Sequence, residues 1–296
     1  MNSLSQLKLL FIINPHSGNN KIDSKKVIIQ YLQKFNHILE WIILDEHIDK
    51  VIIKKKVVEF QPDRVVAVGG DGTIKLAAEF LLHTDICLGL IPAGSANGFA
   101  KELHIPLNVN KALDIIITGH TKTIHIVRIN GQTCIHLGDI GFNAFVIKKF
   151  ETDAHRGMFG YVKAAWKVLW LQPKMTVILK VDEKELNIKA AMIVIANASK
   201  YGSGALINPD GKLDDEKFEV VVVKKVSILE IFKMMFTHTP FDPSKTQVYQ
   251  VKNVAIQSKR KAHFQVDGEY LGRVNNINAT ILPAALHVVV PGNTVE

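Results

Sequence analysis

The strongest constraint on the fold is an alternation, in the first part of the chain, between short apolar runs and longer segments with helical spacing. Each apolar run is long enough for one buried strand, and each segment between two runs is long enough for one helix. Strands and helices that alternate at these lengths form βαβ units with a parallel sheet. The sequence therefore predicts an α/β N-terminal domain. Its expected strands are 7–14, 38–44, 64–68 and 86–91, and its expected helices are 22–36, 47–60, 74–83 and 97–103.

The pattern changes near residue 122, where short β-branched segments separated by turns replace the alternation. Such segments predict a mainly antiparallel β-sandwich or open barrel. We therefore expect a first domain at 1–124, a second domain at 125–282, and a final segment, 283–296, whose strand returns to either domain. The expected strands are 123–129, 133–138, 175–181, 188–197, 217–224, 247–257, 263–266, 276–282 and 286–290.

The composition excludes several classes of protein. Of 296 residues, 47% are hydrophobic and 22% are charged, which excludes a disordered chain. Two cysteines exclude a disulfide scaffold and a multi-cysteine zinc module, so we expect Cys87 and Cys134 to be small buried hydrophobes in a reducing compartment. No apolar run reaches the roughly 18 residues that span a bilayer, and the run at 9–13 is too short for a signal peptide. We expect a cytoplasmic protein.

The charge balance favours an anionic partner. Lysine and arginine total 36 against 28 aspartate and glutamate residues, which gives a net charge of +8. Nucleotides, nucleic acids and acidic membrane surfaces all suit this charge, although solubility alone also explains it. We expect no nucleic-acid partner, because we find no basic cluster interleaved with aromatic residues. The lysine run at 54–56 is interpreted as a solvated helix face.

Three glycine-bearing turns carry the chemistry of the first domain. Each lies just beyond the expected C-terminal end of a strand, where open α/β sheets bind ligands. The first turn, residues 14–21, offers Asn14 and Ser17 as hydrogen-bonding groups, Gly18 for close backbone approach and Lys21 for a phosphate. A plain turn before a helix explains this stretch equally well.

The second turn, residues 69–73, holds three glycines around one carboxylate. Its backbone N–H groups can meet an anion, and the helix behind it adds the positive end of its dipole. A carboxylate among the glycines indicates Mg²⁺ binding or proton acceptance, because anion binding alone would not use one. The candidate residues of this turn are Gly69, Gly70, Asp71, Gly72 and Thr73.

The third turn, residues 92–98, opens a helix with Gly94, Ser95 and Asn97. We expect Ser95 to be the N-cap, and Ser95 or Asn97 could also bind phosphate; simple capping is the alternative. The chain has no GxxxxGK[ST] motif, no protein-kinase signature and no HExxH, CxxC or GxSxG. We assign no catalytic or metal role to any histidine.

These motifs resemble those of a known family. NPHSG, GGDGT and PAGSANG, in this order, resemble the diacylglycerol kinase catalytic domain superfamily, which includes soluble bacterial diacylglycerol kinases and sphingosine and ceramide kinases. The resemblance continues in NASKYGSG at 197–204, in PDGKLDD at 209–215 and in DGE at 267–269. GGDGT alone is shared with NAD kinases, but the set of six is specific and covers nearly the whole chain.

The resemblance implies a nucleotide-binding domain similar to that of NAD kinase and phosphofructokinase, and a β-sandwich that holds a lipid. It also implies ATP and Mg²⁺, with an active site between the domains. The matching residues near the nucleotide would be Asn14, Ser17, Gly70, Thr73 and Ser95. The apolar helices expected at 155–171 and 228–236 would line an acyl cleft, touch the membrane or pack on the sandwich core.

By the same resemblance, Asp71 and Glu269 would be the catalytic carboxylates. Asp215, with the carbonyls of Lys212 and Lys217, would hold a structural Mg²⁺. The expected reaction transfers the γ-phosphoryl group of ATP to the hydroxyl of a lipid alcohol, such as diacylglycerol or a sphingoid base, at an anionic membrane surface that the enzyme binds peripherally.

One position departs from the diacylglycerol kinase pattern GTxND. Gly98 stands where that pattern has aspartate, and SANG is closer to the GSGN form of sphingosine and ceramide kinases. This departure slightly favours a sphingoid base or another lipid alcohol over diacylglycerol. An NAD kinase and a non-catalytic nucleotide-binding regulator are the alternative functions, and a homodimer is left open.

Overall fold

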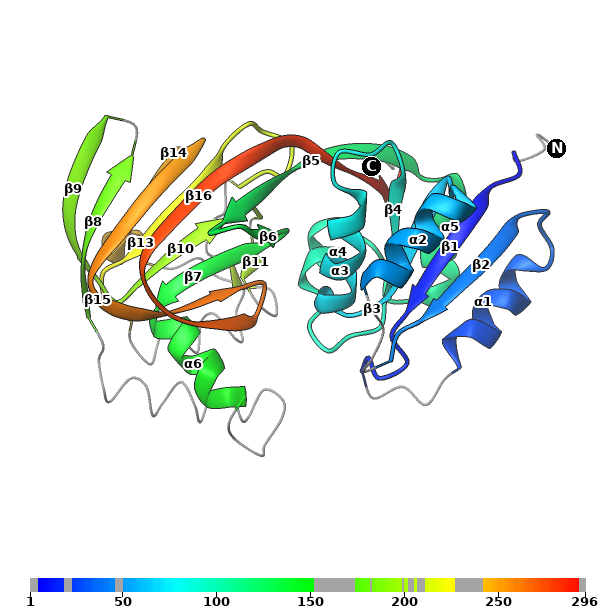
Figure 1. The fold of residues 1–296 in the computed structure, drawn as a ribbon, viewed down its shortest axis with the longest axis horizontal. Helices are drawn as coiled ribbons and strands as arrows, with labels where there is room; N and C mark the ends of the chain where they lie inside the picture. The colour runs from blue at the N-terminus through cyan, green and yellow to red at the C-terminus, as the bar shows by residue number, and fades with distance from the viewer. Residues whose placement is uncertain are drawn as a thin grey trace. The chain divides into compact units, whose positions relative to one another are not determined.

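The computed structural model describes residues 5–18, 23–45, 50–151, 174–181, 183–198, 200–201, 205–206, 211–226 and 242–292. The chain divides into two compact units (Figure 1). The first unit is Met1–Ile124 together with Ala284–Glu296, and the second unit is His125–Pro283. The apolar helices expected at 155–171 and 228–236 lie outside the described residues.

The first unit has the expected parallel sheet. Its strands run in the order β2-β1-β3-β4, and each neighbouring pair is parallel. The apolar side chains of β1, β3 and β4 are buried on both faces because helices cover the sheet on both sides, whereas Ile38 and Ile43 of the edge strand β2 are exposed. The strands are β1 (Lys8–Ile13), β2 (Ile38–Ile43), β3 (Arg64–Gly69) and β4 (Cys87–Pro92).

Helices lie in the connections between these strands, because parallel neighbours are joined by right-handed crossovers. The helices α1 and α5 pack against each other, whereas α2 and α3 contact β1 (Figure 1). Asp23 caps α1 as expected, accepting the Lys26 N–H at 3.1 Å. The helix α5 was not among the expected helices, although Asn108 caps it and its apolar face is buried. The helices are α1 (Ser24–Leu32), α2 (Lys50–Phe60), α3 (Asp71–Leu81), α4 (Gly98–Glu102) and α5 (Val109–Thr118).

The expected N-cap of α4 is wrong. The helix begins at Gly98, so the N-cap position falls on Asn97 and not on Ser95. Asn97 has a positive φ of 51°, and its side chain turns back to Gly94, where it accepts the N–H at 2.8 Å and donates to the carbonyl at 2.7 Å. Asparagine tolerates this left-handed conformation better than serine does, which explains the shift.

The last strand belongs to both units. β16 (Glu269–Val290) is continuous, so the strands expected at 276–282 and 286–290 are one element. Its residues from Ala284 onward join the first unit, where Val288 pairs with Leu88 of β4 in parallel. Leu286 and Val288 are fully buried there. The sheet of the first unit is therefore completed by the far end of the chain.

The second unit is the expected, mainly antiparallel β-sandwich. Its strands follow the path β14-β13-β10-β7-β15-β16, with β8 beside β15. Side chains from these strands meet in one buried apolar core, which includes Ile140, Val177, Ile195, Phe218 and Phe264. The strands are β5 (His120–Ile129), β6 (Gln132–Cys134), β7 (Leu137–Gly141), β8 (Met175–Val181), β9 (Lys184–Ala190), β10 (Met192–Ala196), β11 (Lys200–Tyr201), β12 (Ala205–Leu206), β13 (Phe218–Val223), β14 (Thr246–Val251) and β15 (Asn253–Val266).

A helix that was not expected, α6 (Phe142–Glu151), follows β7 directly. Asp139 is fully buried and holds the start of this helix by accepting the N–H of Ala144 at 2.8 Å and the amide of Asn143 at 2.7 Å. Gln265 of β15 also donates to Asp139. A buried carboxylate is stable there because charge-assisted hydrogen bonds replace its water.

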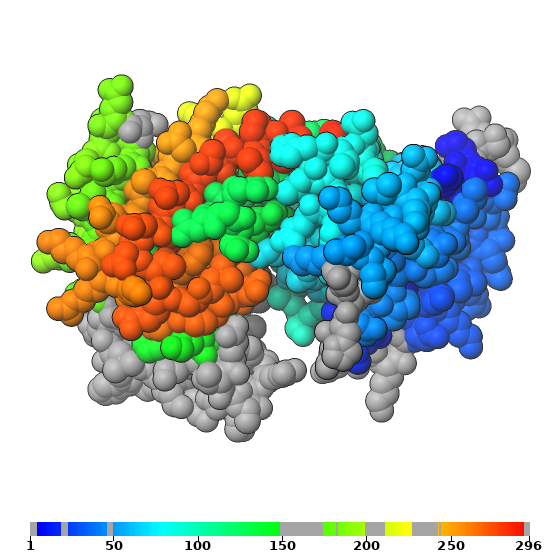
Figure 2. Space-filling view, viewed as in Figure 1, coloured from blue at the N-terminus to red at the C-terminus, as the bar shows by residue number. Residues whose placement is uncertain are grey.

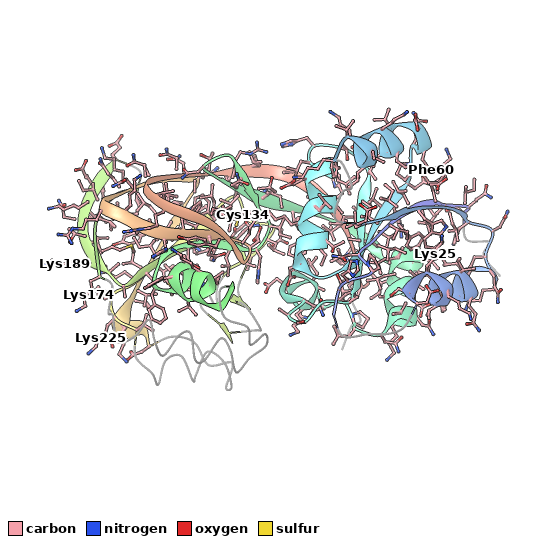
Figure 3. All side chains as sticks on the ribbon, turned by 60° about the horizontal axis from the view of Figure 1, so that its bottom comes forward. Lys25, Phe60, Cys134, Lys174, Lys189 and Lys225 are labelled. Carbon is pink, nitrogen blue, oxygen red and sulfur yellow. The ribbon has the colours of Figure 1, made fainter. Side chains whose placement is uncertain are left out.

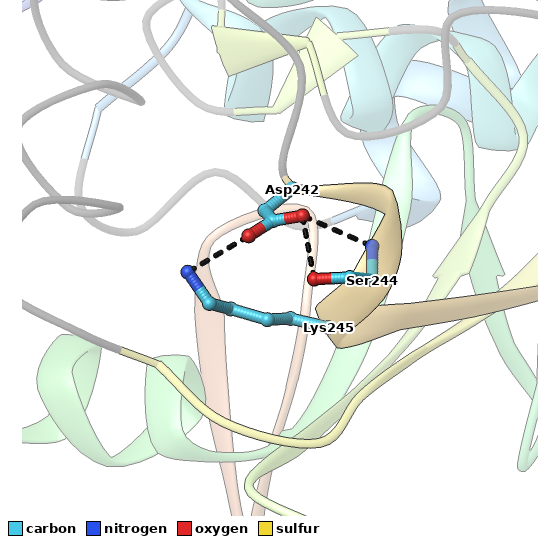
Figure 4. Close-up of polar contacts among 3 residues, drawn as sticks. All are labelled: Asp242, Ser244 and Lys245. Carbon is cyan, nitrogen blue, oxygen red and sulfur yellow. Dashed lines mark hydrogen bonds and ion pairs between the residues drawn. The ribbon is translucent and has the colours of Figure 1, made fainter.

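A short polar turn precedes β14. The 3-10 helix η1 (Pro243–Lys245) is held by Asp242, which accepts the N–H and the hydroxyl of Ser244 and pairs with Lys245 at 3.0 Å (Figure 4). The Ser244 hydroxyl and the Lys245 ammonium lower the pKa of Asp242 to about 2. The turn therefore keeps its anionic acceptor at neutral pH.

The two cysteines differ in burial. Cys134 is fully buried, as expected, but Cys87 is only half-buried, with its Sγ 3.4 Å from the Thr121 hydroxyl. Cys87 is the first residue of β4, where the strand reaches the edge of the core, so its expected burial is wrong. Among the described residues, no helix is long and apolar enough to cross a membrane.

Candidate functional site

The three glycine turns come together at one edge of the first unit. They follow β1, β3 and β4, which are neighbours in the sheet, so their carboxyl ends lie side by side. Backbone hydrogen bonds join them: Asn14 N donates to the Val68 carbonyl at 3.0 Å, and Ala93 N donates to the Gly69 carbonyl at 2.8 Å. This arrangement confirms that the motifs are brought together by the parallel sheet.

The turns touch through backbone, which only glycine allows here. A Cβ added to Gly18, whose φ is +71°, would lie 2.4 Å from the Ala93 carbonyl oxygen. A Cβ added to Gly94 would lie 2.5 Å from the Gly70 Cα. Because these glycines have no side chains, the turns lie in direct backbone contact at the edge of the sheet where open α/β sheets bind ligands.

Two polar side chains link the first and second turns. The Asn14 side-chain amide donates from Nδ2 to the Thr73 hydroxyl at 3.4 Å, and its Oδ1 accepts the His16 N–H at 3.0 Å. Ser17 N donates to the Asn14 carbonyl at 3.2 Å, and Thr73 is 4% exposed. Asn14 therefore holds the shape of the first turn, while Thr73 anchors it to α3.

Asp71 has a positioning role that the sequence did not reveal. Its carboxylate accepts the Gly98 N–H at 3.0 Å and the Phe99 N–H at 3.1 Å. It thus caps α4 from across the sheet edge and ties the second turn to the third. A carboxylate has about four acceptor sites, so two backbone bonds leave lone pairs for a cation or a proton. The structure is compatible with a catalytic role for Asp71, which stays a prediction.

The other predicted nucleotide-binding residues lie on the same edge, with one exception. Gly69 is buried, Gly70 and Gly94 are partly exposed, and Gly72 and Ser95 are exposed. Ser95 makes no cap and is free to meet a ligand. Lys21 lies outside the described residues.

Glu269 belongs to the second unit and begins β16. The two-residue turn Asp267-Gly268 places it there, with φ of +51° and +86°, and Val266 pairs with Glu269 across the hairpin. Glu269 is exposed, so its carboxylate is accessible to solvent and to a ligand.

Asp267, which was expected only as part of the DGE motif, has a structural role. Its carboxylate accepts three consecutive backbone N–H groups, those of Ile135, His136 and Leu137, at 3.0 to 3.1 Å. These bonds fasten the hairpin that carries Glu269 to β7. The Asp-Gly pair between two apolar strands was the sequence signal that could have identified this role.

The acidic segment, whose residues 211–217 are described, belongs to the second unit and is held by contacts with two other segments of that unit. The Leu213 carbonyl accepts the His125 N–H at 2.8 Å, and Glu216 pairs with Lys252 at 2.6 Å, which lowers the pKa of Glu216. Within the described residues, the Asp215 Oδ1 atom is buried and has no hydrogen-bond partner. A buried carboxylate oxygen without a hydrogen-bond donor suits a cation. It is compatible with the predicted metal site, which consists of the Asp215 carboxylate and the backbone carbonyls of Lys212 and Lys217.

Asn197, in the glycine-rich segment of the motif set, is also structural. It is 1% exposed and donates from its amide to the His125 carbonyl at 2.8 Å, while its N–H reaches the His136 carbonyl at 3.0 Å. It therefore joins β10 to β5 and to the start of β7. The remaining residues of that segment are mostly outside the described part of the chain.

Comparison with known proteins agrees with this architecture. Residues 8–129 match the family described as diacylglycerol kinase catalytic domain. Residues 139–290, more than half of the chain, match the family described as YegS C-terminal NAD kinase beta sandwich-like domain. The two matches cover both units.

Individual relatives agree with the family matches. A protein named diacylglycerol kinase from Staphylococcus epidermidis is 27% identical over 235 residues, which are 76% of this chain and 74% of that protein. A diacylglycerol kinase structure from Bacillus anthracis superposes with a TM-score of 0.73 at 21% identity, covering 97% of this chain and 98% of the other.

An NAD kinase from Archaeoglobus fulgidus, solved in complex with ATP, has the same fold more distantly. It superposes with a TM-score of 0.52 at 15% identity, covering 95% of this chain and 93% of the other.

The parallel-sheet unit with its glycine turns, the β-sandwich and the two family matches lead to one conclusion. The chain belongs to the diacylglycerol kinase catalytic domain superfamily and is a kinase.

Proposed function

We propose that this kinase transfers the γ-phosphoryl group of ATP to the hydroxyl of a lipid alcohol, such as diacylglycerol or a sphingoid base, in the presence of Mg²⁺. The observation that carries the proposal is the backbone contact of the glycine turns at the carboxyl edge of β1, β3 and β4. The names of the curated relatives support the lipid as acceptor.

The phosphate side of the reaction rests on backbone groups of the first unit. Phosphoryl transfer needs positioning and charge stabilisation more than covalent chemistry. The first turn of α3 directs free N–H groups outward at Asp71 and Gly72, because the first four N–H groups of a helix have no partner within it. The exposed hydroxyl of Ser95 and the half-buried hydroxyl of Ser17 supply further hydrogen bonds.

The carboxylates have separate tasks in this proposal. Asp71 would hold the Mg²⁺ that neutralises phosphate charge when it is bound, whereas Asp215 would hold a separate, structural Mg²⁺. Glu269, exposed at the start of β16, would accept the proton of the lipid hydroxyl. Asp267 keeps Glu269 in place through its three backbone hydrogen bonds.

The lipid acceptor places the reaction at a membrane. A net charge of +8 attracts the chain to an anionic surface. We therefore propose reversible, peripheral binding to anionic membranes, weakened by salt.

The acceptor is tested with labelled ATP and Mg²⁺, offered separately with micelles of diacylglycerol, sphingosine, ceramide, monoacylglycerol or phosphatidylglycerol, and with NAD. We expect label in a lipid and none in NAD. Gly98 in place of aspartate slightly favours a sphingoid base or another alcohol over diacylglycerol. Label in NAD alone would establish the NAD kinase, which the ATP-bound structural neighbour makes the second candidate. No transfer to any acceptor would instead favour a nucleotide-binding regulator.

A further inference from the structure

A basic bulge interrupts the pairing of β15 with β16. Gln257 pairs with Asn276 and Ala262 pairs with Val274, so residues 258–261 of β15 stand opposite Asn275 alone. The bulged sequence is Ser258-Lys259-Arg260-Lys261. Extra residues in one strand bend it and redirect its side chains, and such bulges are common beside functional sites.

Hydrogen bonds give the bulge a defined shape. The Ser258 hydroxyl donates to the Arg260 carbonyl at 2.7 Å, and the Asn275 amide donates to the Ser258 carbonyl at 3.3 Å. Arg273 of β16 donates from Nη2 and Nε to the Lys261 carbonyl at 2.7 and 3.2 Å. The guanidinium of Arg273 is thus held beside the bulge with its remaining N–H groups unused by these bonds.

A pocket of about 580 Å³ opens next to this bulge, within the second unit. One wall is the ring of Phe145, stacked on His263 at 4.3 Å and 1°, and His263 is fixed by the Tyr270 hydroxyl at 2.7 Å. Five cationic side chains line the pocket, and no aspartate or glutamate is among its described lining residues. The five are Lys174, Lys259, Arg260, Lys261 and Arg273.

Within the part of the chain that the structure describes, no carboxylate neutralises the charge of this region. None of the five cations forms an ion pair within the described residues, in contrast to Lys180, which pairs with Glu185 on the neighbouring hairpin. Figure 3 shows Lys174, Lys189 and Lys225 projecting outward at the same end of the second unit. In Figure 2 the orange segment that contains β15 forms part of the surface of that unit. Cations drawn together without carboxylates repel one another, so a bound anion would stabilise the arrangement.

We propose that this pocket is a second ligand site, which binds the phosphoryl group of a phosphate ester. A phosphate ester carries concentrated negative charge and several acceptor oxygens, which match a fixed guanidinium surrounded by ammonium groups. The apolar side chains of Phe145 and Met175 at the same pocket suit the organic part of such a ligand. The site is independent of the proposed kinase reaction, because none of its residues belongs to the glycine turns or to the predicted metal set.

The ligand has two sources to be distinguished, a soluble phosphate ester and the headgroup of an anionic phospholipid. The full-length chain is titrated with inorganic phosphate and with glycerol 3-phosphate by calorimetry. In parallel it is sedimented with vesicles of phosphatidylcholine, with or without phosphatidylglycerol. No ATP is present, so failure of the kinase proposal leaves the result intact.

The chain offers a charge-matched control for the key variant. K259Q/R260Q/K261Q removes three positive charges from the pocket, and K54Q/K55Q/K56Q removes three from α2 in the first unit, where Lys55 pairs with Glu59 and Lys56 with Glu40. A second pair is Lys174→Gln in the pocket and Lys184→Gln at the other end of the β8–β9 hairpin, where Lys184 pairs with Val181. Apart from the half-buried Lys56, these side chains are exposed, so the variants are expected to fold, and circular dichroism verifies this.

We expect the pocket triple variant to weaken binding of the glycerol phosphate or of the phosphatidylglycerol vesicles by about 100-fold, since each Lys or Arg near an anionic surface contributes about 1 kcal/mol. Lys174→Gln should weaken it about fivefold, whereas both control variants should stay within about twofold of the wild type. Whichever source loses affinity in the pocket variants is the source of the ligand. Equal losses in the pocket and control variants would show a net-charge effect only, and a wild-type chain that binds neither source would equally overturn the proposal.

Discussion

At the residue scale, single side chains in this kinase combine structural and chemical tasks. Asp71 caps α4 through two backbone N–H groups, yet it is also the carboxylate predicted to meet Mg²⁺ or a proton. Asp267 holds three N–H groups next to the predicted base Glu269. Carboxylates near reacting groups must be positioned as well as charged, so these bonds fix where each acid can act.

We predict that Asp71→Asn lowers the rate of phosphoryl transfer by about 100-fold or more, because loss of a catalytic carboxylate typically costs 10²–10⁴. The fold should survive, since asparagine keeps the shape of the side chain and one of its two acceptor oxygens. Asp23→Asn is the control, because Asp23 also caps a helix, accepting the Lys26 N–H at the start of α1, away from the glycine turns. Steady-state rates and melting temperatures are measured for both. An Asp71→Asn enzyme that keeps more than about a tenth of the wild-type rate contradicts the assignment.

His37 predicts a pH dependence of stability. Burial, and then the charge of Arg64, lower the pKa of His37, whose Nδ1 accepts the Leu7 N–H at 3.2 Å. Because the folded pKa is below the unfolded value of about 6.5, the unfolded state binds the proton more readily. This contribution to stability is therefore complete above about pH 6.5 and is lost as the pH falls toward the folded pKa.

The test is urea unfolding between pH 8 and pH 5. His37→Asn keeps an acceptor but does not titrate, so its free energy of unfolding should fall less across this range than that of the wild type. The control is His120→Asn, because His120 is exposed and its loss should leave the wild-type pH dependence in place. An unchanged pH dependence in His37→Asn would assign the effect to other groups.

At the element scale, loops at strand ends carry the site, and their shape depends on partners distant in sequence. The third turn is shaped by Asn97 bonding back to Gly94 and by Asp71 from α3. The acidic segment is held by the His125 N–H of β5 and by Lys252. Such loops carry function because the strands and helices fix their ends.

We predict that Mg²⁺ raises the melting temperature of the wild type but not of Asp215→Ala, because the buried Asp215 Oδ1 has no donor within the described residues. A buried acceptor without a partner costs about 1–3 kcal/mol, which a cation would offset. Asp214→Ala is the control, since Asp214 is the exposed neighbouring acid. Equal melting temperatures with and without Mg²⁺ in the wild type would rule out a structural cation.

At the scale of the whole molecule, the first unit is built from two separate stretches of chain, and the second unit is the single stretch between them. The first unit includes the residues from Ala284 onward, which follow the second unit in the sequence. β16 supplies both the hairpin that bears Glu269 and buried apolar side chains beside β4. A long strand that serves two cores makes the stability of the first unit depend on the end of the chain.

We predict that Leu286→Ala destabilises the first unit by about 2–5 kcal/mol, because it removes a fully buried side chain and leaves a cavity. Hydrogen exchange should show lost protection in β3 and β4, which precede Leu286 by about two hundred residues. Thr280→Ala, at an exposed position of the same strand in the second unit, should leave that protection unchanged. Loss of protection confined to the second unit would contradict this account.

The sequence by itself determined the α/β unit, the β-sandwich, the family and the placement of three glycine turns at strand ends. These depend on local periodicity and on motif spacing, which one chain displays directly. The helix α5, the cap of α4, the union of the last strands and the basic bulge at 258–261 were decided by tertiary structure. Asn97 in place of Ser95 as the N-cap depends on a bond back to Gly94, and Asp71 meets Gly98 only because β3 and β4 are neighbours. Long-range pairing of backbone groups and side chains sets these features, and no local pattern encodes it.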